Sequence, residues 1–321
     1  MIIQRIVLSA IVSLGLFGFA HGQSFPDRML KIVAPFPAGG PTDVMARLAA
    51  QALQTNLKQT VIVENQPGAG GRLGAKAVAK ANPDGHTLLL GGTNINAILP
   101  ALYKNLDFDA VNGFAGVAVV ATSSGALAVH PAVPAKTIAE LISYAKDRPG
   151  ELKYGSVPGI SPHFTLELFK IRTGTRITFI PYKGGAPAIN DVLGGTIDML
   201  SNNKSVLLPL LQAGKLRALA VQSTQRWPEL PDVPTMQESG LLGFPSETWY
   251  SIVAPAGTPT AIIQTLNAAI NESLKSPEMR ASFARLGIDA RIHTSQEYAA
   301  IMAEQAREWS TIVELTGIKI D

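Results

Sequence analysis

The sequence predicts an α/β fold of two lobes, each a mixed, mostly parallel sheet with helices on both faces. Strand, turn and helix alternate from residue 25 to about residue 102, and the alternation resumes from residue 126 to residue 221. Most of the turns between a strand and the next helix are rich in glycine. The 321 residues, 46% of them hydrophobic, are enough to form two cores.

The first strand–turn–helix unit predicts an anion-binding turn. An apolar strand at 30–34 runs into the turn Pro35-Phe36-Pro37-Ala38-Gly39-Gly40, and an amphipathic helix follows at once. The first N–H groups of a helix lack intrahelical partners and carry partial positive charge, and the glycines let a ligand approach the backbone. The same residues also fit an ordinary turn in which Thr42 or Asp43 caps the helix.

Two further units repeat this arrangement. A strand at 60–63 leads to a turn with Gly68, Ala69, Gly70 and Gly71 and then to a helix, and the strand at 87–91 ends in the turn 91–96. Because parallel strands end at the same sheet edge, these turns are predicted to form one wall of a cleft, where ligands of open α/β folds bind.

The second lobe is predicted to begin after a strand at 117–121. Its strands are expected at 126–130, 153–155, 177–180, 197–200 and 216–221, with helices between them. Helix starts are predicted at Thr137 with Glu140, at Ser161 as N-cap with Pro162 as the first helical residue, and near Ser205.

A strand at 248–254 is predicted to return to the first lobe. Helices then start at Thr258-Pro259, at Ser276-Pro277 and at Thr294 with Glu297. The predicted division is residues 23–122 plus 248–321 for lobe 1 and residues 123–247 for lobe 2. Two chain crossings make a hinge, so the cleft is expected to close around a small molecule.

Composition and the N-terminus restrict the class of protein. The formal charge is +3, and no basic run suited to nucleic acid is present. There is no cysteine, which excludes disulfides, thiolate metal sites and cysteine nucleophiles. Residues 1–22 resemble a signal peptide, with Arg5 before an apolar run and cleavage expected after Ala20 or Gly22. The alternative is a retained anchor, but the apolar run is shorter than the ~20 residues of a spanning helix.

Motifs for chemistry are incomplete. The run 68–74 departs from the dinucleotide fingerprint because Leu73 stands where its last glycine belongs, and it lacks the lysine of a phosphate-binding loop. No cofactor is expected, and the five scattered histidines predict no metal site. Ser161 and His163 leave open an exported hydrolase, although two residues this close at a helix start point in different directions. Lys204 follows a lobe-2 strand, where it is either solvated or faces the cleft.

The ordered motifs resemble the Bug family, the substrate-binding subunits of tripartite tricarboxylate transporters. The residues that carry the resemblance span nearly the whole mature chain: VAPFPAGGPTDVMAR, VENQPGAGGRLGA, ANPDGHTLLLG, YGSVPGISPH, PYKGGAPAINDVLGG and LPDVPTMQESG. The resemblance implies a monomeric, periplasmic, type II Venus-flytrap protein without enzymatic activity. Such a protein captures a small mono- or dicarboxylate and passes it to membrane subunits.

The resemblance also implies a set of ligand-binding residues. In lobe 1 they are Phe36, Pro37, Ala38, Gly39, Gly40, Gly68, Ala69, Gly70, Gly71, Thr93 and Asn94, and in lobe 2 Ser156, Gly159, Ser161, His163, Tyr182 and Gly184. This chain departs from the family pattern at His86, at Val157-Pro158, at Ile160 and at residues 202–204. The departures near Ser156 and Lys204 are expected to affect the identity of the ligand more than the fold.

Overall fold

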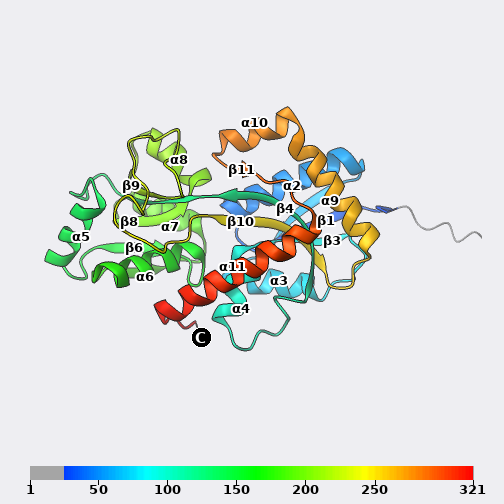
Figure 1. The fold of residues 1–321 in the computed structure, drawn as a ribbon, viewed down its shortest axis with the longest axis horizontal. Helices are drawn as coiled ribbons and strands as arrows, with labels where there is room; N and C mark the ends of the chain where they lie inside the picture. The colour runs from blue at the N-terminus through cyan, green and yellow to red at the C-terminus, as the bar shows by residue number, and fades with distance from the viewer. Residues whose placement is uncertain (1–24, 321) are drawn as a thin grey trace, which may run out of the picture.

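The computed structural model describes residues 25–320, which form two α/β lobes (Figure 1). The predicted signal peptide, residues 1–22, lies outside the described residues. Within residues 25–320, no helix has the length and apolar character needed to cross a membrane.

Lobe 1 is built on a six-stranded sheet with the strand order β11-β4-β10-β3-β1-β2. The strands are β1 Leu30–Ala34, β2 Val61–Asn65, β3 Thr87–Gly92, β4 Phe114–Ser123, β10 Thr248–Pro255 and β11 Asp289–Ala290. Strand β1 pairs in parallel with β2 and β3, whereas β10 runs antiparallel to β3 and β4. The sheet is therefore mixed, with the returning strand β10 at its centre.

Helices cover both faces of this sheet, as predicted. They are α2 Pro41–Leu57, η1 Ala69–Gly71, α3 Arg72–Ala79, η2 Thr93–Ile98, α4 Leu99–Leu102, α9 Thr260–Lys275, α10 Pro277–Arg285 and α11 Ser295–Thr316. Side chains alternate along the strands, so Ile32 packs into the core under α2 and α9, and Val33 packs into the core under α3 and α11.

Lobe 2 has a five-stranded sheet with the order β7-β6-β8-β5-β9. Its strands are β5 Gly125–Val129, β6 Lys153–Ser156, β7 Thr178–Pro181, β8 Met199–Asn203 and β9 Arg217–Gln222. Its helices are α5 Ile138–Asp147, α6 Ser161–Thr173, α7 Gly185–Leu193 and α8 Lys204–Gln212. Strand β6 is parallel to β7 and β8, and β5 is antiparallel to β8 and β9.

The chain passes between the lobes at two places. Strand β4 ends at Ser123 and β5 begins at Gly125, so the first crossing is almost continuous strand. The second crossing runs from the end of β9 to the start of β10 through residues 223–247. On this basis we propose the division into lobe 1, residues 23–122 and 248–321, and lobe 2, residues 123–247.

Three predicted helix caps are confirmed, whereas α8 begins at Lys204 after Asn203 and α9 at Thr260 after Pro259, both without a side-chain cap. The side chains of Thr137, Ser276 and Thr294 each accept a hydrogen bond from the N–H three residues later. The cap predicted at Ser161 is wrong: Ile160 has the extended conformation of the N-cap, with φ −109° and ψ 163°, and Ser161 is the first helical residue.

The turn expected at 91–96 is also different, because Thr93–Ile98 is a π-helical turn. Gly92 precedes this turn and has φ +119°. A Cβ added at Gly92 would lie 2.0 Å from the carbonyl oxygen of Trp249 on the neighbouring strand β10. Only glycine fits there, and the turn is thereby held against β10.

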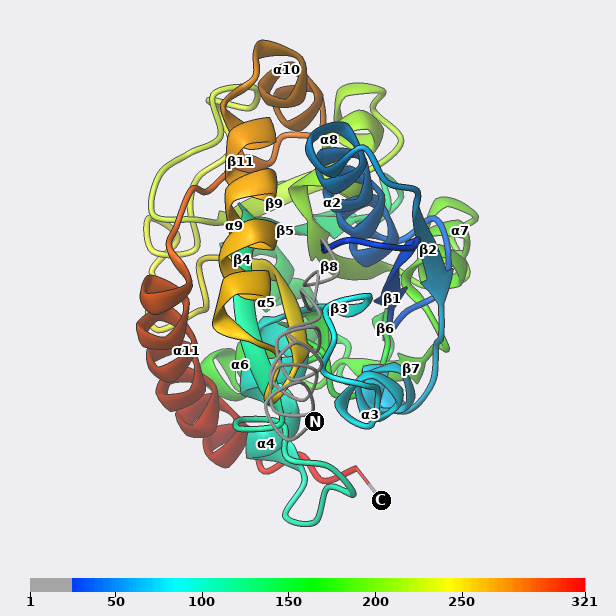
Figure 2. The ribbon, with the colours of Figure 1, turned by 90° about the vertical axis from the view of Figure 1, so that its right-hand side faces the viewer.

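Helix α11 links the lobes. Figure 1 shows it running from lobe 1 toward α6 of lobe 2. Near its C-terminal end, Trp309 meets the ring of Phe164 edge-on, with ring centroids 6.0 Å apart. Both side chains are fully buried, together with Ile98 of η2. The second view places α11 and α6 side by side on the same flank of the molecule (Figure 2).

Candidate functional site

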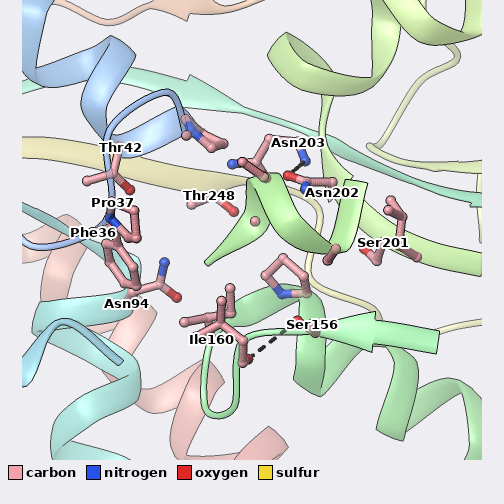
Figure 3. A pocket seen from close by; sticks show the side chains of 18 of the residues that line it. Phe36, Pro37, Thr42, Asn94, Ser156, Ile160, Ser201, Asn202, Asn203 and Thr248 are labelled. Carbon is pink, nitrogen blue, oxygen red and sulfur yellow. Dashed lines mark hydrogen bonds between the residues drawn. The ribbon is translucent and has the colours of Figure 1, made fainter. Parts of the chain in front are cut away.

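A pocket lies between the two lobes, with an empty volume of about 770 Å³ that includes its open mouth (Figure 3). Lobe 1 contributes the turn before α2, the π-helical turn η2 and strand β10. Lobe 2 contributes the turn between β6 and α6, the start of α7 and the end of β8.

No formally charged side chain lines this pocket among the residues that the structure describes. The polar lining consists of hydroxyl and amide side chains, such as Thr42, Asn94, Ser156, Asn202 and Thr248. An anion bound here would therefore be held by hydrogen bonds and helix dipoles, since no lysine or arginine is available to pair with it.

The N-terminus of α2 forms the lobe-1 wall. Gly40 is the N-cap and Pro41 the first helical residue, and both line the pocket. Proline has no N–H, so the N–H groups of Thr42 and Asp43 are the ones without acceptors inside the helix. This end of α2 offers backbone donors and a dipole of the sign that suits an anion.

Asp43 holds the turn in shape from behind. Its buried carboxylate accepts hydrogen bonds from the N–H of Gly39, from Arg47 Nε and from Asn65 Nδ2, each at 3.0 Å. Burial raises the pKa of Asp43, but these hydrogen bonds outweigh it and hold the pKa below the usual value. The interpretation in which Thr42 or Asp43 caps the helix is wrong, because the N-cap is Gly40, without a side-chain hydrogen bond. Asp43, the third helical residue, instead fixes the turn that presents Gly40 to the pocket.

The N-terminus of α7 forms part of the lobe-2 wall. Gly185 and Ala186 open this helix and line the pocket, and their N–H groups have no acceptor within the helix. The N-cap, Gly184, lies against Pro37 of lobe 1: a Cβ added at Gly184 would be 3.0 Å from Pro37 Cγ. The starts of α2 and α7 thus approach each other across the cleft.

The N-terminus of α6 is already occupied by groups of the chain itself. The N–H of Ser161 donates to Asn94 Oδ1 of lobe 1 at 3.1 Å, and Pro162 has no N–H. The N–H of His163 donates to the carbonyl of Ile160 at 2.9 Å. The N–H of Gly159 donates to His163 Nδ1 at 3.2 Å.

The residues predicted for the site fall into two groups. Those that line the pocket are Phe36, Pro37, Ala38, Gly40, Asn94 and Ser156. Those outside its lining are Gly39, Gly68, Ala69, Gly70, Gly71, Thr93, Gly159, Ser161, His163, Tyr182 and Gly184.

Some residues of the second group pack behind or beside the lining. A Cβ at Gly71 would lie 3.2 Å from the ring of Phe36, so the second glycine turn packs behind the first. Thr93 is fully buried and accepts a hydrogen bond from the N–H of Trp249 at 2.9 Å. Tyr182 donates to Asp191 Oδ2 at 2.5 Å, within lobe 2.

Sequence reasoning missed the lining residues of β10, β8 and α7. Thr248 and Tyr250 reach the pocket because β10 pairs antiparallel with β3 at the centre of the sheet. Asn203 Nδ2 donates to Tyr250 Oη, which forms a second side-chain bridge between the lobes. In the sequence, the one sign that these residues belong to the site is the unusual Asn202-Asn203 pair, which follows a predicted strand.

Ser161 and His163 do not form the pair that a hydrolase needs. Among the hydrogen bonds of residues 25–320, none joins these two side chains, and His163 Nδ1 is taken by the N–H of Gly159. The imidazole is buried and stacks on Phe179 with ring centroids 4.2 Å apart. Burial lowers the pKa of His163 to about 4, so it is neutral at pH 7.

This burial predicts a pH dependence of stability. In the unfolded chain the pKa of His163 returns to about 6.5, so between pH 6.5 and pH 4 only the unfolded chain binds the proton. Stability should therefore be complete above pH 6.5 and fall by about 2–3 kcal/mol as the pH drops toward 4. Urea unfolding across this range measures the loss. The variant His163→Gln keeps an acceptor for Gly159 but does not ionise, so an equally steep loss in this variant would contradict the assignment.

Two residues left open by the sequence lie away from the pocket. Lys204 Nζ pairs with Glu229 at 2.8 Å and lies over the ring of Trp227, in a separate cleft at the back of the hinge. His86 Nε2 is 3.0 Å from Asp27 Oδ1, so it ties the first described residues to lobe 1. No group of three or more potential ligands suited to a metal ion occurs in residues 25–320.

Two α/β lobes joined by two crossings, with a pocket between them, define a solute-binding protein of the Venus-flytrap class. The chain belongs to the tripartite tricarboxylate transporter family receptors, the TctC family, whose model matches residues 45–318. The resemblance to Bug proteins is thereby confirmed, and members of this family are periplasmic binding proteins.

The similarity to known relatives extends over almost the full length of this chain. The chain is 36% identical to protein BugT of Bordetella pertussis, over 97% of this chain and 96% of BugT. It is similar to the structure of R. palustris Rpa4515 with adipate, at 35% identity and TM-score 0.88, over 92% of this chain and 99% of that chain. It is also similar to MatC of Rhodopseudomonas palustris with bound malate, at 31% identity and TM-score 0.85, over 90% and 100%.

Proposed function

We propose that this protein is a periplasmic receptor that captures a small organic acid, a mono- or dicarboxylate, between its lobes. The observation that carries the proposal is a pocket without charged side chains into which the N-termini of α2 and α7 project from opposite lobes. The adipate and malate complexes of similar proteins agree with a ligand of this kind.

The physical basis is that two helix ends act together on one ligand. A negative charge at a helix N-terminus gains about 0.3–1 kcal/mol at an exposed site and up to about 2 kcal/mol where it is partly buried. Hydrogen bonds to a charged group add about 1.5–3 kcal/mol each. Because the two helix starts belong to different lobes, a carboxylate between them favours the arrangement in which the lobes are together.

Release and delivery follow from the same chemistry. With no ion pair to break, separation of the lobes weakens all contacts at once, which suits a receptor that passes its ligand to membrane subunits of a tripartite tricarboxylate transporter. The receptor is proposed to act as a monomer without enzymatic activity, after cleavage of a signal peptide near residues 20–22. Its site includes the lining residues Phe36, Pro37, Ala38, Gly40, Asn94 and Ser156, with the second glycine turn as support.

The test is to look for a captured acid and then to measure its effect on stability. Native mass spectra of protein purified from the periplasm, recorded before and after denaturation, should show a released small carboxylate. For protein without ligand, an acid at 100 times its Kd should add about 2.7 kcal/mol to the free energy of unfolding. Diamides of the same acids serve as uncharged controls. If no carboxylate is released and none in a broad panel raises the melting temperature, the proposal fails.

A further inference from the structure

Asn94 occupies a position where an anion would otherwise be favoured. It lies on the π-helical turn η2 of lobe 1 and lines the pocket, as Figure 3 shows. Its Oδ1 accepts the N–H of Ser161, the first residue of the 13-residue helix α6 in lobe 2, at 3.1 Å. Since a backbone N–H only donates, this bond fixes the orientation of the amide, with Oδ1 on α6 and Nδ2 turned to the other side.

Neither of the next two residues of α6 offers a free N–H, as described above. Pro162 has none, and the N–H groups of His163 and Gly159 bond within the same turn. Among the first three residues of α6, the Ser161 N–H is therefore the one that bonds to lobe 1, through Asn94 Oδ1. Among residues 25–320, Asn94 Nδ2 has no hydrogen-bond partner and remains available as a donor.

The π-helical turn explains why Asn94 reaches across the cleft. Such turns are rare and are concentrated at functional sites. In this one, Asn96 Oδ1 accepts the N–H of Gly92 at 2.8 Å, and Thr93 Oγ1 accepts the N–H of Trp249, so residues on both sides of Asn94 are anchored in lobe 1. Asn94 is left pointing toward lobe 2 on a rigid support.

We infer that Asn94 determines which acids this pocket accepts, by acting as a tethered, neutral substitute for a carboxylate at the N-terminus of α6. This inference rests on the proposed function and assigns a specificity role within the same site. With Asn94 in place, the starts of α2 and α7 hold one carboxylate, and the α6 end of the pocket offers only a neutral amide donor. A second carboxylate that reaches α6 must compete with Asn94 for the Ser161 N–H.

Removal of the side chain should change the balance between acids with one and with two carboxylates. In Asn94→Ala the Ser161 N–H and the α6 dipole become available, and Asn94 Nδ2 is lost for all ligands. The affinity of a dicarboxylate relative to the monocarboxylate of equal length should therefore rise by about tenfold, the value of one hydrogen bond to a charged group. Asn94→Asp places a fixed negative charge at the same point, so this ratio should fall by about tenfold.

The experiment uses isothermal titration of the full mature chain with succinate, adipate and suberate and with butyrate, hexanoate and octanoate. The matched control is Asn202→Ala, because Asn202 also lines the pocket but its Oδ1 accepts only the N–H of its neighbour Asn203. In this control, the affinities for the two kinds of acid should change in parallel. Asn94→Ser, which is too short to reach α6, replaces Asn94→Ala if the alanine variant does not fold.

Three outcomes are separable. The inference is supported if the affinity for a dicarboxylate, relative to the monocarboxylate of equal length, rises in Asn94→Ala, falls in Asn94→Asp and stays constant in Asn202→Ala. If wild-type protein binds acids but the ratio in the Asn94 variants equals that of the wild type, the role of Asn94 is refuted and the proposed function stands. If wild-type protein binds none of the acids, the proposed function fails and the inference fails with it.

Discussion

Replacement of Trp309 by alanine is expected to lower the free energy of unfolding by about 3–5 kcal/mol. Trp309 is fully buried and packs edge-on against Phe164, between α11, the π-helical turn η2 and α6. The loss combines the transfer free energy of a large aromatic side chain with a cavity that three rigid elements do not fill. Because α6 belongs to lobe 2 and the others to lobe 1, the same change should weaken the attachment between the lobes.

Urea unfolding followed by circular dichroism measures this loss without relying on tryptophan emission. The control is Trp309→Phe, which keeps most of the packing and removes Nε1, a buried atom without a hydrogen-bond partner in the part of the chain described. Since no hydrogen bond is lost, phenylalanine should cost clearly less than alanine. A cost below about 1 kcal/mol for Trp309→Ala would show that the cluster does not stabilise the fold.

The fold was predictable because its signals are local. Apolar strands, glycine turns and amphipathic helices follow one another within a few residues, and capping patterns such as Thr294 with Glu297 were confirmed as hydrogen bonds. The π-helical turn at Thr93–Ile98 was not predicted, because it depends on contacts with β10, more than a hundred residues further along the chain. Tertiary contacts there override local pattern.

The same distinction applies to the site. The lining residues that were predicted in lobe 1, such as Pro37 and Gly40, belong to one local turn whose chemistry can be read directly. Thr248 and Tyr250 were missed because only the sheet order brings β10 to the pocket. The donors of α6 looked available in sequence, but Asn94, 67 residues earlier in the chain, takes the Ser161 N–H.

Replacement of Gly184 by valine is expected to weaken ligand binding by about 5- to 150-fold while leaving the fold intact. Gly184 has φ −168° and ψ 167°, an extended conformation that valine adopts readily, so the lobe itself should tolerate the change. Its Cβ, however, would lie 3.0 Å from Pro37 Cγ of the opposite lobe, and the γ carbons would come closer still. Overpacking of this kind costs about 1–3 kcal/mol. Because the clash arises only when the lobes come together, this cost lowers the affinity for the ligand and leaves the separate lobes unaffected.

A double-mutant cycle with Pro37→Ala separates this steric effect from a loss of ligand contacts. Alanine removes the Cγ and Cδ atoms that a side chain at position 184 would meet. Gly184→Val should therefore lower the ligand affinity much less in the Pro37→Ala background than in the wild type. Gly194→Ala, at the other end of α7, where the added Cβ has an ordinary contact at 3.4 Å, controls for effects on the helix. Equal losses of affinity from Gly184→Val in both backgrounds would mean that Pro37 and Gly184 do not meet when the ligand is bound, and the cleft would then close by a different contact.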